Sequence, residues 1–340
     1  SRVGPRLTRP CLPEHLSPQH LRMVLENCAD VAPAAPGAGT GLPFPGMKWS
    51  MFLLAGQSNM AGRGPLSERC ASLAATPDER IAVLGADGAW RVPASHPLHW
   101  DKPDKVGVGP GLEFARAVVD FLPEGEQRVG LLPYAFGGSE LARWAPEGGD
   151  LFAAAVASVR RGAEAGGQLV GVLWHQGESD SGSEGDAASY ADRLRSVIRE
   201  LRSQCGLPGV PMVLGELGVH FLDMAGDARF RFAVRVNRAI AEVAASAGPG
   251  IAVASARGLA HRGDRLHFSA EAADTLGRRY AWQWLQLAGR AHGSLRALLA
   301  DGGLEPPLLS EEGEGALEPR PGRGSEGEAN CAAPELAEIS

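Results

Sequence analysis

Four short polar segments of this 340-residue sequence hold residue types that could together break an ester bond. Each follows an apolar run, and the four are GQSNM (56–60), FGGSELARW (136–144), HQGESDS (175–181) and HRGDRLHFS (261–269). They supply a hydroxyl, a pair of glycines, a side-chain amide, an imidazole and a carboxylate. A serine hydroxyl is a weak nucleophile unless an imidazole removes its proton, and a carboxylate beside the imidazole stabilises it as a base. The combination predicts acyl transfer through a serine.

Asp264 and His267 stand three residues apart in one short segment, so the carboxylate could orient the imidazole through a local contact. The carbonyl oxygen attacked by Ser58 would become negative and would need preorganised hydrogen-bond donors, the oxyanion hole. Glycines suit this task because no Cβ blocks a close approach. The sequence offers three sources of donors: the backbone N–H of Ser58, an N–H of Gly137 or Gly138, and the side-chain amide of Gln176.

The elements that must position these residues form an alternating pattern. Near-continuous apolar runs, typical of parallel strands buried on both faces, occur at 51–55, 128–135, 169–175, 211–217 and 251–256. Helical patterns fill the gaps at 111–122, 150–165, 186–204, 227–247 and 269–288. The alternation predicts an α/β protein with a doubly wound, five-stranded parallel sheet. Ligands bind outside the carboxyl ends of such strands, so the four polar segments should converge there.

One further pattern interrupts the first crossover of this sheet. Residues 80–92, RIAVLGADGAWRV, alternate around an Asp87-Gly88 turn and predict a small β-hairpin.

We expect one catalytic domain between two extensions. Residues 1–46 read as an irregular N-terminal extension with a short helix near 17–28 and a Pro/Gly/Ala linker. Residues 47–290 form the expected esterase domain. Residues 291–340 form an acidic, Gly- and Pro-rich tail, which we expect to be disordered because it offers too little apolar surface to offset its ordering entropy.

Composition narrows the class of protein. Hydrophobic residues make up 44% and charged residues 21%, as in ordinary globular proteins. The net charge of −7 argues against a nucleic-acid partner, and no apolar run reaches the roughly 20 residues of a membrane helix. We therefore expect a soluble protein, cytoplasmic by default with secretion left open, and the oligomeric state is not predicted.

Metal binding is not indicated either. The five cysteines show no C-x-x-C spacing, which favours neither a zinc site nor a disulfide framework. His96 and His99 have a spacing that could suit a metal, but no H-E-x-x-H motif or carboxylate cluster accompanies them. Surface or loop histidines are the better interpretation.

The segments GQSNMAGRG, VGVGPGLEFA, FGGSELARW, LWHQGESD and DRLHFS resemble, in this order, those of the SGNH-type hydrolases. More narrowly, they resemble the plant and bacterial carbohydrate esterases of family 6, whose domain is also called the sialate O-acetylesterase (SASA) domain. The resemblance spans residues 47 to 287. It implies a three-layer α/β/α sandwich of the SGNH or flavodoxin-like type. It also implies removal of O-acetyl groups from sugars without a metal or cofactor.

The resemblance also implies residue roles. Ser58 would be the nucleophile, His267 the general base and Asp264 its orienting acid. Either Gly137 or Gly138 would donate to the oxyanion, together with Gln176, which stands where many SGNH enzymes carry an asparagine. The supporting residues would be Gln57, Asn59, His175 and Glu178, with Glu178 holding its loop by hydrogen bonds. From its place after a buried strand, beside Trp174, we expect His175 to be packed and hydrogen-bonded along the crevice and not to act as a second base.

Other interpretations fit the same residues. A sugar-binding or scaffold protein could keep this fold with little activity, although the complete triad argues against it. An esterase for lipid or small aryl esters would use the same residues. The α/β-hydrolase pattern G-x-S-x-G is absent, since Met60 holds its last position. Trp90, Trp100 and Trp144 lie in polar segments and could either stack on a sugar or belong to the core.

Overall fold

The computed structural model describes residues 43–66, 77–92, 96–222 and 226–290. The helix expected near 17–28 and the tail expected at 291–340 lie outside the described residues.

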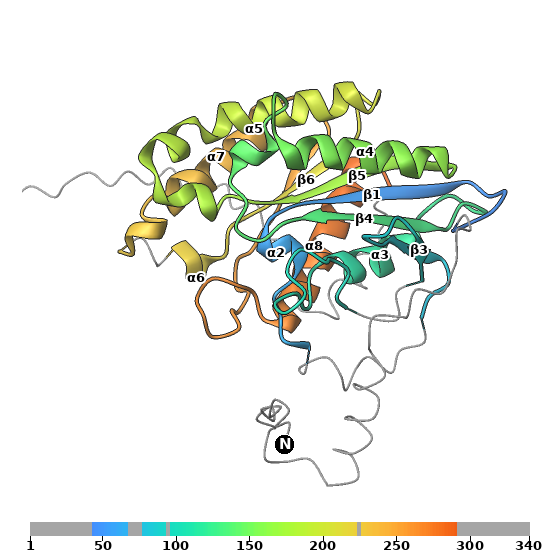
Figure 1. Ribbon diagram of the computed structural model, residues 1–340, viewed down its shortest axis with the longest axis horizontal. Coiled ribbons are helices and arrows are strands. Elements are labelled where there is room, and N and C mark those ends of the chain that lie inside the picture. The colour runs from blue at the N-terminus through green and yellow to red at the C-terminus, as the bar shows by residue number, and fades with distance from the viewer. Residues whose placement is uncertain (1–42, 67–76, 93–95, 223–225, 291–340) are drawn as a thin grey trace, which may run out of the picture.

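A mostly parallel sheet forms the middle layer of the molecule (Figure 1). Its strands run in the order β3-β2-β4-β1-β5-β6-β7. The five predicted strands are confirmed as β1 (Trp49–Gly56), β4 (Val129–Ala135), β5 (Gly167–His175), β6 (Met212–Gly215) and β7 (Ile251–Ala254). All of these pair in parallel, and β1 lies between β4 and β5. Counted in chain order, these five have the 2-1-3-4-5 arrangement of flavodoxin-like sheets.

The predicted hairpin is present but extends the sheet, so the expectation of five strands was wrong. Strands β2 (Ile81–Leu84) and β3 (Trp90–Arg91) pair antiparallel, with Leu84 opposite Trp90. Strand β2 also pairs in parallel with β4, Ile81 lying opposite Val129. The sequence predicts the turn of the hairpin. The pairing of β2 with the open edge of β4 depends on tertiary contacts, which the four apolar residues of β2 do not specify.

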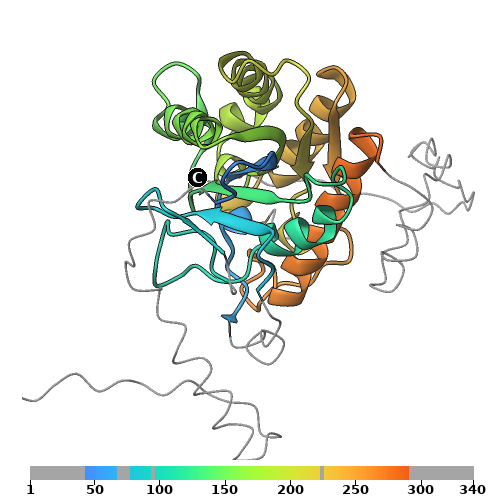
Figure 2. The ribbon, with the colours of Figure 1, turned by 90° about the vertical axis from the view of Figure 1, so that its right-hand side faces the viewer.

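Helices cover both faces of the sheet. Helices α4 (Asp150–Glu164), α5 (Glu184–Gln204) and α7 (Ala233–Ser246) lie on one face, and α3 (Gly111–Val119) and α8 (Ala270–Leu287) lie on the other (Figures 1 and 2). Each predicted helix is confirmed, although the pattern at 227–247 divides into a 3₁₀ turn, η4 (Ala228–Phe230), and α7. Among the described residues, no helix is long and apolar enough to cross a membrane.

Two helix starts follow directly from the sequence. The Ser183 hydroxyl accepts the backbone N–H of Asp186 at the start of α5, and the Ser269 hydroxyl accepts that of Ala272 at the start of α8. A serine at the N-cap satisfies a donor that the helix itself leaves unpaired. The cap of α8 matters for the site because Ser269 lies two residues after His267.

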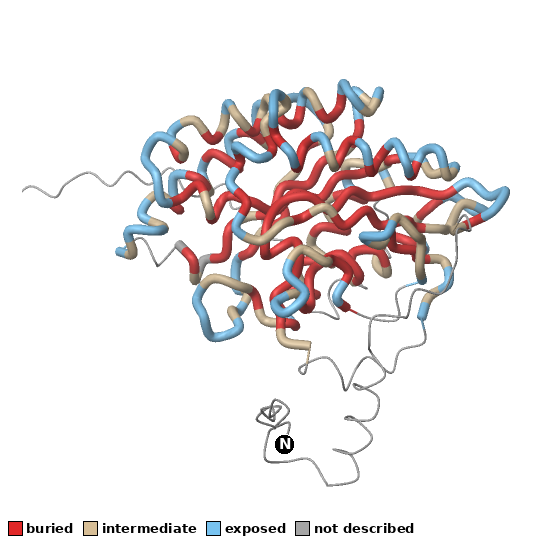
Figure 3. Tube along the Cα trace, viewed as in Figure 1, coloured by how far each residue is buried: buried red, intermediate tan, exposed pale blue. Residues whose placement is uncertain are grey.

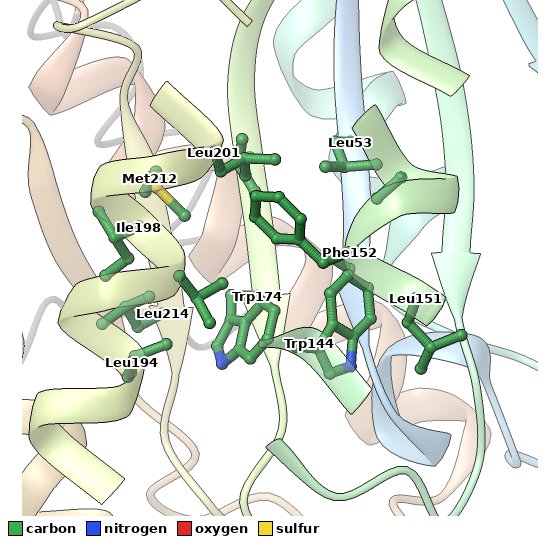
Figure 4. Packing of buried hydrophobic residues seen from close by; sticks show 14 of the residues in the cluster. Leu53, Trp144, Leu151, Phe152, Trp174, Leu194, Ile198, Leu201, Met212 and Leu214 are labelled. Carbon is green, nitrogen blue, oxygen red and sulfur yellow. The ribbon is translucent and has the colours of Figure 1, made fainter. Parts of the chain in front are cut away.

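The core lies on both faces of the buried sheet (Figure 3). Side chains of β1 alternate between the two: Met51, Leu53 and Ala55 pack toward α4, α5 and α7, whereas Phe52 and Leu54 pack toward α3 and α8. On the first face, Trp144 meets Trp174 edge to face, with ring centroids 5.0 Å apart (Figure 4). Trp144 is only 2% exposed, so it belongs to the core and is not available to stack on a sugar.

Candidate active site

The polar segments meet because their strands are neighbours. Gly56 at the end of β1 lies opposite Ala135 of β4 and opposite His175 of β5. Gly56 has φ +131°, and a Cβ there would lie 2.1 Å from the carbonyl oxygen of His175. Glycine therefore allows the ends of β1 and β5 to approach closely, just before the chain turns into the short helix α2 (Ser58–Ala61).

Ser58, His267 and Asp264 lie in a hydrogen-bonded row. The Ser58 Oγ is 3.0 Å from His267 Nε2, and His267 Nδ1 is 2.7 Å from Asp264 Oδ2. The other carboxylate oxygen of Asp264 accepts the backbone N–H groups of Leu266 and His267, at 2.9 and 2.8 Å. The loop therefore holds its own carboxylate in place, and the contacts that a serine nucleophile, a base and an orienting acid require are all present.

Burial and neighbouring charges set the protonation states of Asp264 and His267. Burial alone would raise the pKa of Asp264. Hydrogen bonds lower this pKa well below its usual range, and they come from the backbone N–H and imidazole of His267, the backbone N–H of Leu266 and the Arg262 guanidinium. Burial is also the largest influence on His267 and lowers its pKa, Asp264 opposes that change, and Arg262 and Arg63 reinforce it. At neutral pH the carboxylate is charged and the imidazole is neutral, as a general base must be.

Asn59, next to Ser58, fastens the loop that carries His267. Its amide nitrogen donates to the carbonyl of Leu266 at 3.2 Å, and its amide oxygen accepts the N–H of Phe268 at 3.2 Å. The same nitrogen donates to Glu178 Oε1 at 2.5 Å. One amide thus joins the residues on both sides of His267 to the strand-end loop after β5.

Glu178 and His175 lie buried behind this amide. His175 Nδ1 is 3.1 Å from the Tyr280 hydroxyl, and its Nε2 is 3.7 Å from Glu178 Oε1. Burial lowers the pKa of His175 to about 3 and raises that of Glu178 to about 7. His175 therefore packs and hydrogen-bonds in the interior as the sequence predicts, and Glu178 contacts Asn59 instead of the imidazole of His267.

The structure separates the two glycines proposed for the oxyanion hole. The N–H of Gly137 donates to Asp101 Oδ2 at 2.7 Å, so that donor is already used. Gly138 is exposed and has φ +78°, a conformation that favours glycine. Within the described part of the chain, the backbone N–H groups of Gly138 and Ser58 have no hydrogen-bond acceptor. They remain free to bind an oxyanion.

Gln176 does not fit its expected role as an oxyanion donor. Its side chain is fully buried, and its amide nitrogen donates to the Ser139 carbonyl at 3.1 Å and to Asp180 Oδ2 at 2.5 Å. Its amide oxygen accepts the Tyr190 hydroxyl at 2.8 Å. Both N–H groups of the amide are thus occupied, and Gln176 joins the loops after β4 and β5. Sequence patterns place an amide at this strand end but do not show which way it points.

Gln57 has a supporting contact of the expected kind. Its side-chain oxygen accepts the backbone N–H groups of Gly177 and Ser179, both at 3.3 Å, and its own N–H donates to the His175 carbonyl at 2.8 Å. These bonds fix the turn before Ser58 against the loop after β5.

A buried ion pair that no sequence pattern indicates lies beside the glycine loop. Arg63 and Asp101 lie 2.6 Å apart, with side chains only 3% and 1% exposed. Asp101 also accepts the Gly137 N–H, so the pair connects the segment after α2 to the loop after β4. Arg63 stands within the GQSNMAGRG segment, but no spacing rule joins it to an aspartate 38 residues away.

His96 and His99 lie in a loop as expected but not at the surface, being 3% and 5% exposed. Burial lowers the pKa of His99 to about 4, so this imidazole is neutral.

The chain is similar to known proteins in both sequence and fold. Residues 48–286 match the model of a family described as carbohydrate esterase, sialic acid-specific acetylesterase. An Arabidopsis thaliana protein named probable carbohydrate esterase At4g34215 is 32% identical over 254 residues, which cover 69% of this chain and 90% of that protein.

Two solved structures are similar in fold. The crystal structure of the same Arabidopsis protein aligns with a TM-score of 0.60 at 30% identity, covering 70% of this chain and 98% of that one. A structure described as a novel carbohydrate acetylesterase from Xanthomonas citri aligns with a TM-score of 0.55 at 17% identity, covering 72% of this chain and 57% of that one. At 17% identity, the similarity to the Xanthomonas citri protein shows a shared fold and nothing about function.

Proposed function

The chain belongs to the carbohydrate esterase, sialic acid-specific acetylesterase family and is a carboxylic ester hydrolase, and we propose that it removes O-acetyl groups from carbohydrates through an acyl-enzyme on Ser58. The observation that carries this assignment of residues is the row from Ser58 Oγ through His267 to Asp264, with distances of 3.0 and 2.7 Å.

The row supports a two-step reaction. His267 Nε2 accepts the hydroxyl proton while Ser58 Oγ attacks the acetyl carbonyl, and Asp264 stabilises the imidazolium that forms. The tetrahedral intermediate collapses, His267 returns the proton to the sugar oxygen, and the deacetylated sugar leaves. Water then attacks the acetyl-serine with His267 again as base, and acetate is released.

The oxyanion of each intermediate would be held by backbone donors. We assign this role to the N–H groups of Ser58 and Gly138, since the Gly137 N–H already binds Asp101 and the Gln176 amide is occupied. Fixed backbone donors need no reorganisation as the charge develops, which is why they contribute strongly to such reactions.

Removing the nucleophile tests the proposal. Ser58→Ala should lower kcat for release of acetate from an acetylated sugar and from p-nitrophenyl acetate by about 10⁴–10⁶. Ser189→Ala, which removes a hydroxyl from helix α5, is the matched control and should keep full activity. Labelling by a fluorophosphonate probe should likewise vanish only in the Ser58 variant. Turnover unchanged in Ser58→Ala would disprove the assignment.

The same experiment separates the alternative functions. A folded wild-type protein that neither turns over nor takes up the probe would favour the alternative of a carbohydrate-binding protein with little activity. A panel of acetylated xylan, O-acetylated sialic acid, acetylated pectin and aryl acetates, each assayed beside the serine variant, would identify the sugar. Turnover of aryl esters alone would favour a general small-ester esterase.

A further inference from the structure

Arg262 binds the same carboxylate oxygen as the imidazole of His267. Its Nε donates to Asp264 Oδ2 at 2.7 Å, and His267 Nδ1 lies at the same distance from that atom. The guanidinium therefore stands one carboxylate oxygen away from the base. A cation in that place competes with the imidazolium for the negative charge of Asp264.

Further contacts fix the orientation of Arg262. Its Nη1 donates to the carbonyl of Arg63 at 3.0 Å, and its backbone N–H donates to the carbonyl of His267 at 2.9 Å. The side chain is 35% exposed, but it is held at both ends of the guanidinium. Exposed ion pairs usually contribute little to stability, because ordering two long side chains costs entropy. Here the hydrogen bonds to neighbouring backbone groups already order the Arg262 side chain.

The other charges around His267 are differently placed. Its own loop carries Asp264, Arg262, Arg265 and His261, whose ring lies against that of His220. Arg63 comes from the segment after α2, where the buried Asp101 neutralises it. His220 of α6 (Val219–Leu222) lies near Asp264 and packs edge to face on Phe268, and Glu178 reaches the loop only through Asn59. Arg262 is thus the cation in direct contact with the carboxylate that orients the base.

We propose that Arg262 is a positioning residue that sets the acidity at which His267 starts to work as a base. By sharing Asp264 Oδ2, it reduces the stabilisation that the carboxylate gives to the imidazolium, so that His267 stays unprotonated in more acidic solution. This role rests on the proposed function, since it concerns the base of the same reaction. Asn59 and the N–H groups of Leu266 and His267 hold the loop geometry, so removal of the Arg262 charge leaves most of that geometry intact.

The pH profile of kcat/KM tests the proposal. Arg262→Gln should move the acid limb to higher pH by about 0.5–1 unit, the effect of one charge at this separation in a partly solvated site. Arg262→Lys keeps the cation and should restore most of the wild-type limb. Arg265→Gln removes the same charge from the same loop, where its side chain has no hydrogen bond or ion pair within the described residues, and should shift the limb less.

A second measurement keeps this inference separate from the proposed function. Titration of the His267 imidazole by NMR in the resting protein, assigned with a His267→Gln variant, needs no turnover, and Arg262→Gln should shift its midpoint in the same direction. Identical midpoints in wild type and Arg262→Gln, or a fall in kcat with an unmoved limb, would overturn the proposal. A wild-type protein without esterase activity would overturn the function and leave the NMR comparison to decide the coupling.

Discussion

Ser58 depends for its proposed reactivity on side chains from the far end of the chain. Its hydroxyl is 3.0 Å from an imidazole that lies 209 residues later. Only a neutral imidazole can accept the proton, and the pKa of His267 is lowered, first by burial and then by the two neighbouring arginines. The site is therefore prepared for catalysis before substrate binds, which is the general condition for efficient proton transfer.

The lowered pKa predicts where activity appears on the pH scale. The fraction of neutral His267 rises as pH rises through its pKa, so kcat/KM should rise with pH along a limb whose midpoint lies below the ordinary imidazole value of about 6.5. Initial rates with p-nitrophenyl acetate from pH 4.5 to 8, corrected for spontaneous hydrolysis, measure this limb. A rate independent of pH would contradict His267 as the base, and a midpoint above 6.5 would contradict the lowering of its pKa.

At the scale of the elements, the loop after β7 must sit correctly against helix α2. Asn59 makes this connection, because its side chain bonds to Leu266 and Phe268 on either side of His267. Besides the hydrogen bond between Ser58 and His267, the Arg262 side chain donates to the carbonyl of Arg63 just after α2. The position of the base thus depends on an amide that comes directly after the nucleophile.

Removing this amide should loosen the base without removing any reacting group. Asn59→Ala should lower kcat by about 10–100-fold with little change in KM, since a small misplacement of a catalytic group is costly. Fluorophosphonate labelling should slow in parallel. Asn237→Ala is a matched control, because Asn237 also bonds a loop N–H, that of Leu217, but among the described residues makes no hydrogen bond to the loop of His267. Equal kcat in Asn59→Ala and wild type would show that the loop holds itself.

In the loops after β4 and β5, a polar residue that was expected to take part in catalysis holds the structure together instead. Gln176 bonds Ser139, Asp180 and Tyr190. It thereby joins the residues before η2 (Leu141–Trp144) to η3 (Ser179–Gly182) and to α5. A buried amide must find such partners because an unpaired polar group in the interior is costly. Gln176 therefore supports the shape of the site while the backbone supplies the expected donors.

At the scale of the whole molecule, Glu178 links the site to stability. Its pKa is raised by burial from the ordinary 4.5 to about 7, so between these values the folded protein holds a proton that the unfolded chain has released. The contribution of Glu178 to the free energy of unfolding must then decrease as pH rises from 4.5 to about 7, by up to roughly 3 kcal/mol. The cost is that of placing a charge beside Asn59 in an interior from which water is excluded.

Glu178→Gln should remove this pH dependence while keeping the acceptor for Asn59. Relative to wild type, the variant should gain up to about 3 kcal/mol in unfolding free energy between pH 4.5 and pH 8. Urea unfolding of both proteins at the two pH values measures the difference, and contributions from the other titrating groups cancel in the comparison. Parallel stability profiles for the two proteins would show that the pKa of Glu178 is not raised in the folded state.

Much of the architecture is local in origin and was readable from the sequence. Near-continuous apolar runs predict the strands β1, β4, β5, β6 and β7, because parallel strands are buried on both faces. Helical periodicity predicts the five long helices, because each helix buries one face. Polar segments after those strands predict where Ser58, His267 and Asp264 meet, since parallel strands end at one edge. The hairpin turn was predicted as well, but its attachment to β4 was not.

The sequence by itself determined the order of the elements and the types of residue at the strand ends. Tertiary structure alone decided which of those residues face one another. It paired Arg63 with Asp101, directed the Gln176 amide into the interior and brought Arg262 onto the oxygen that His267 shares. It also left the N–H of Gly138 without an acceptor among the described residues. The physical reason is that periodicity records how much of each residue is buried. The direction of a hydrogen bond depends on partners that reach the same place only when the chain has folded.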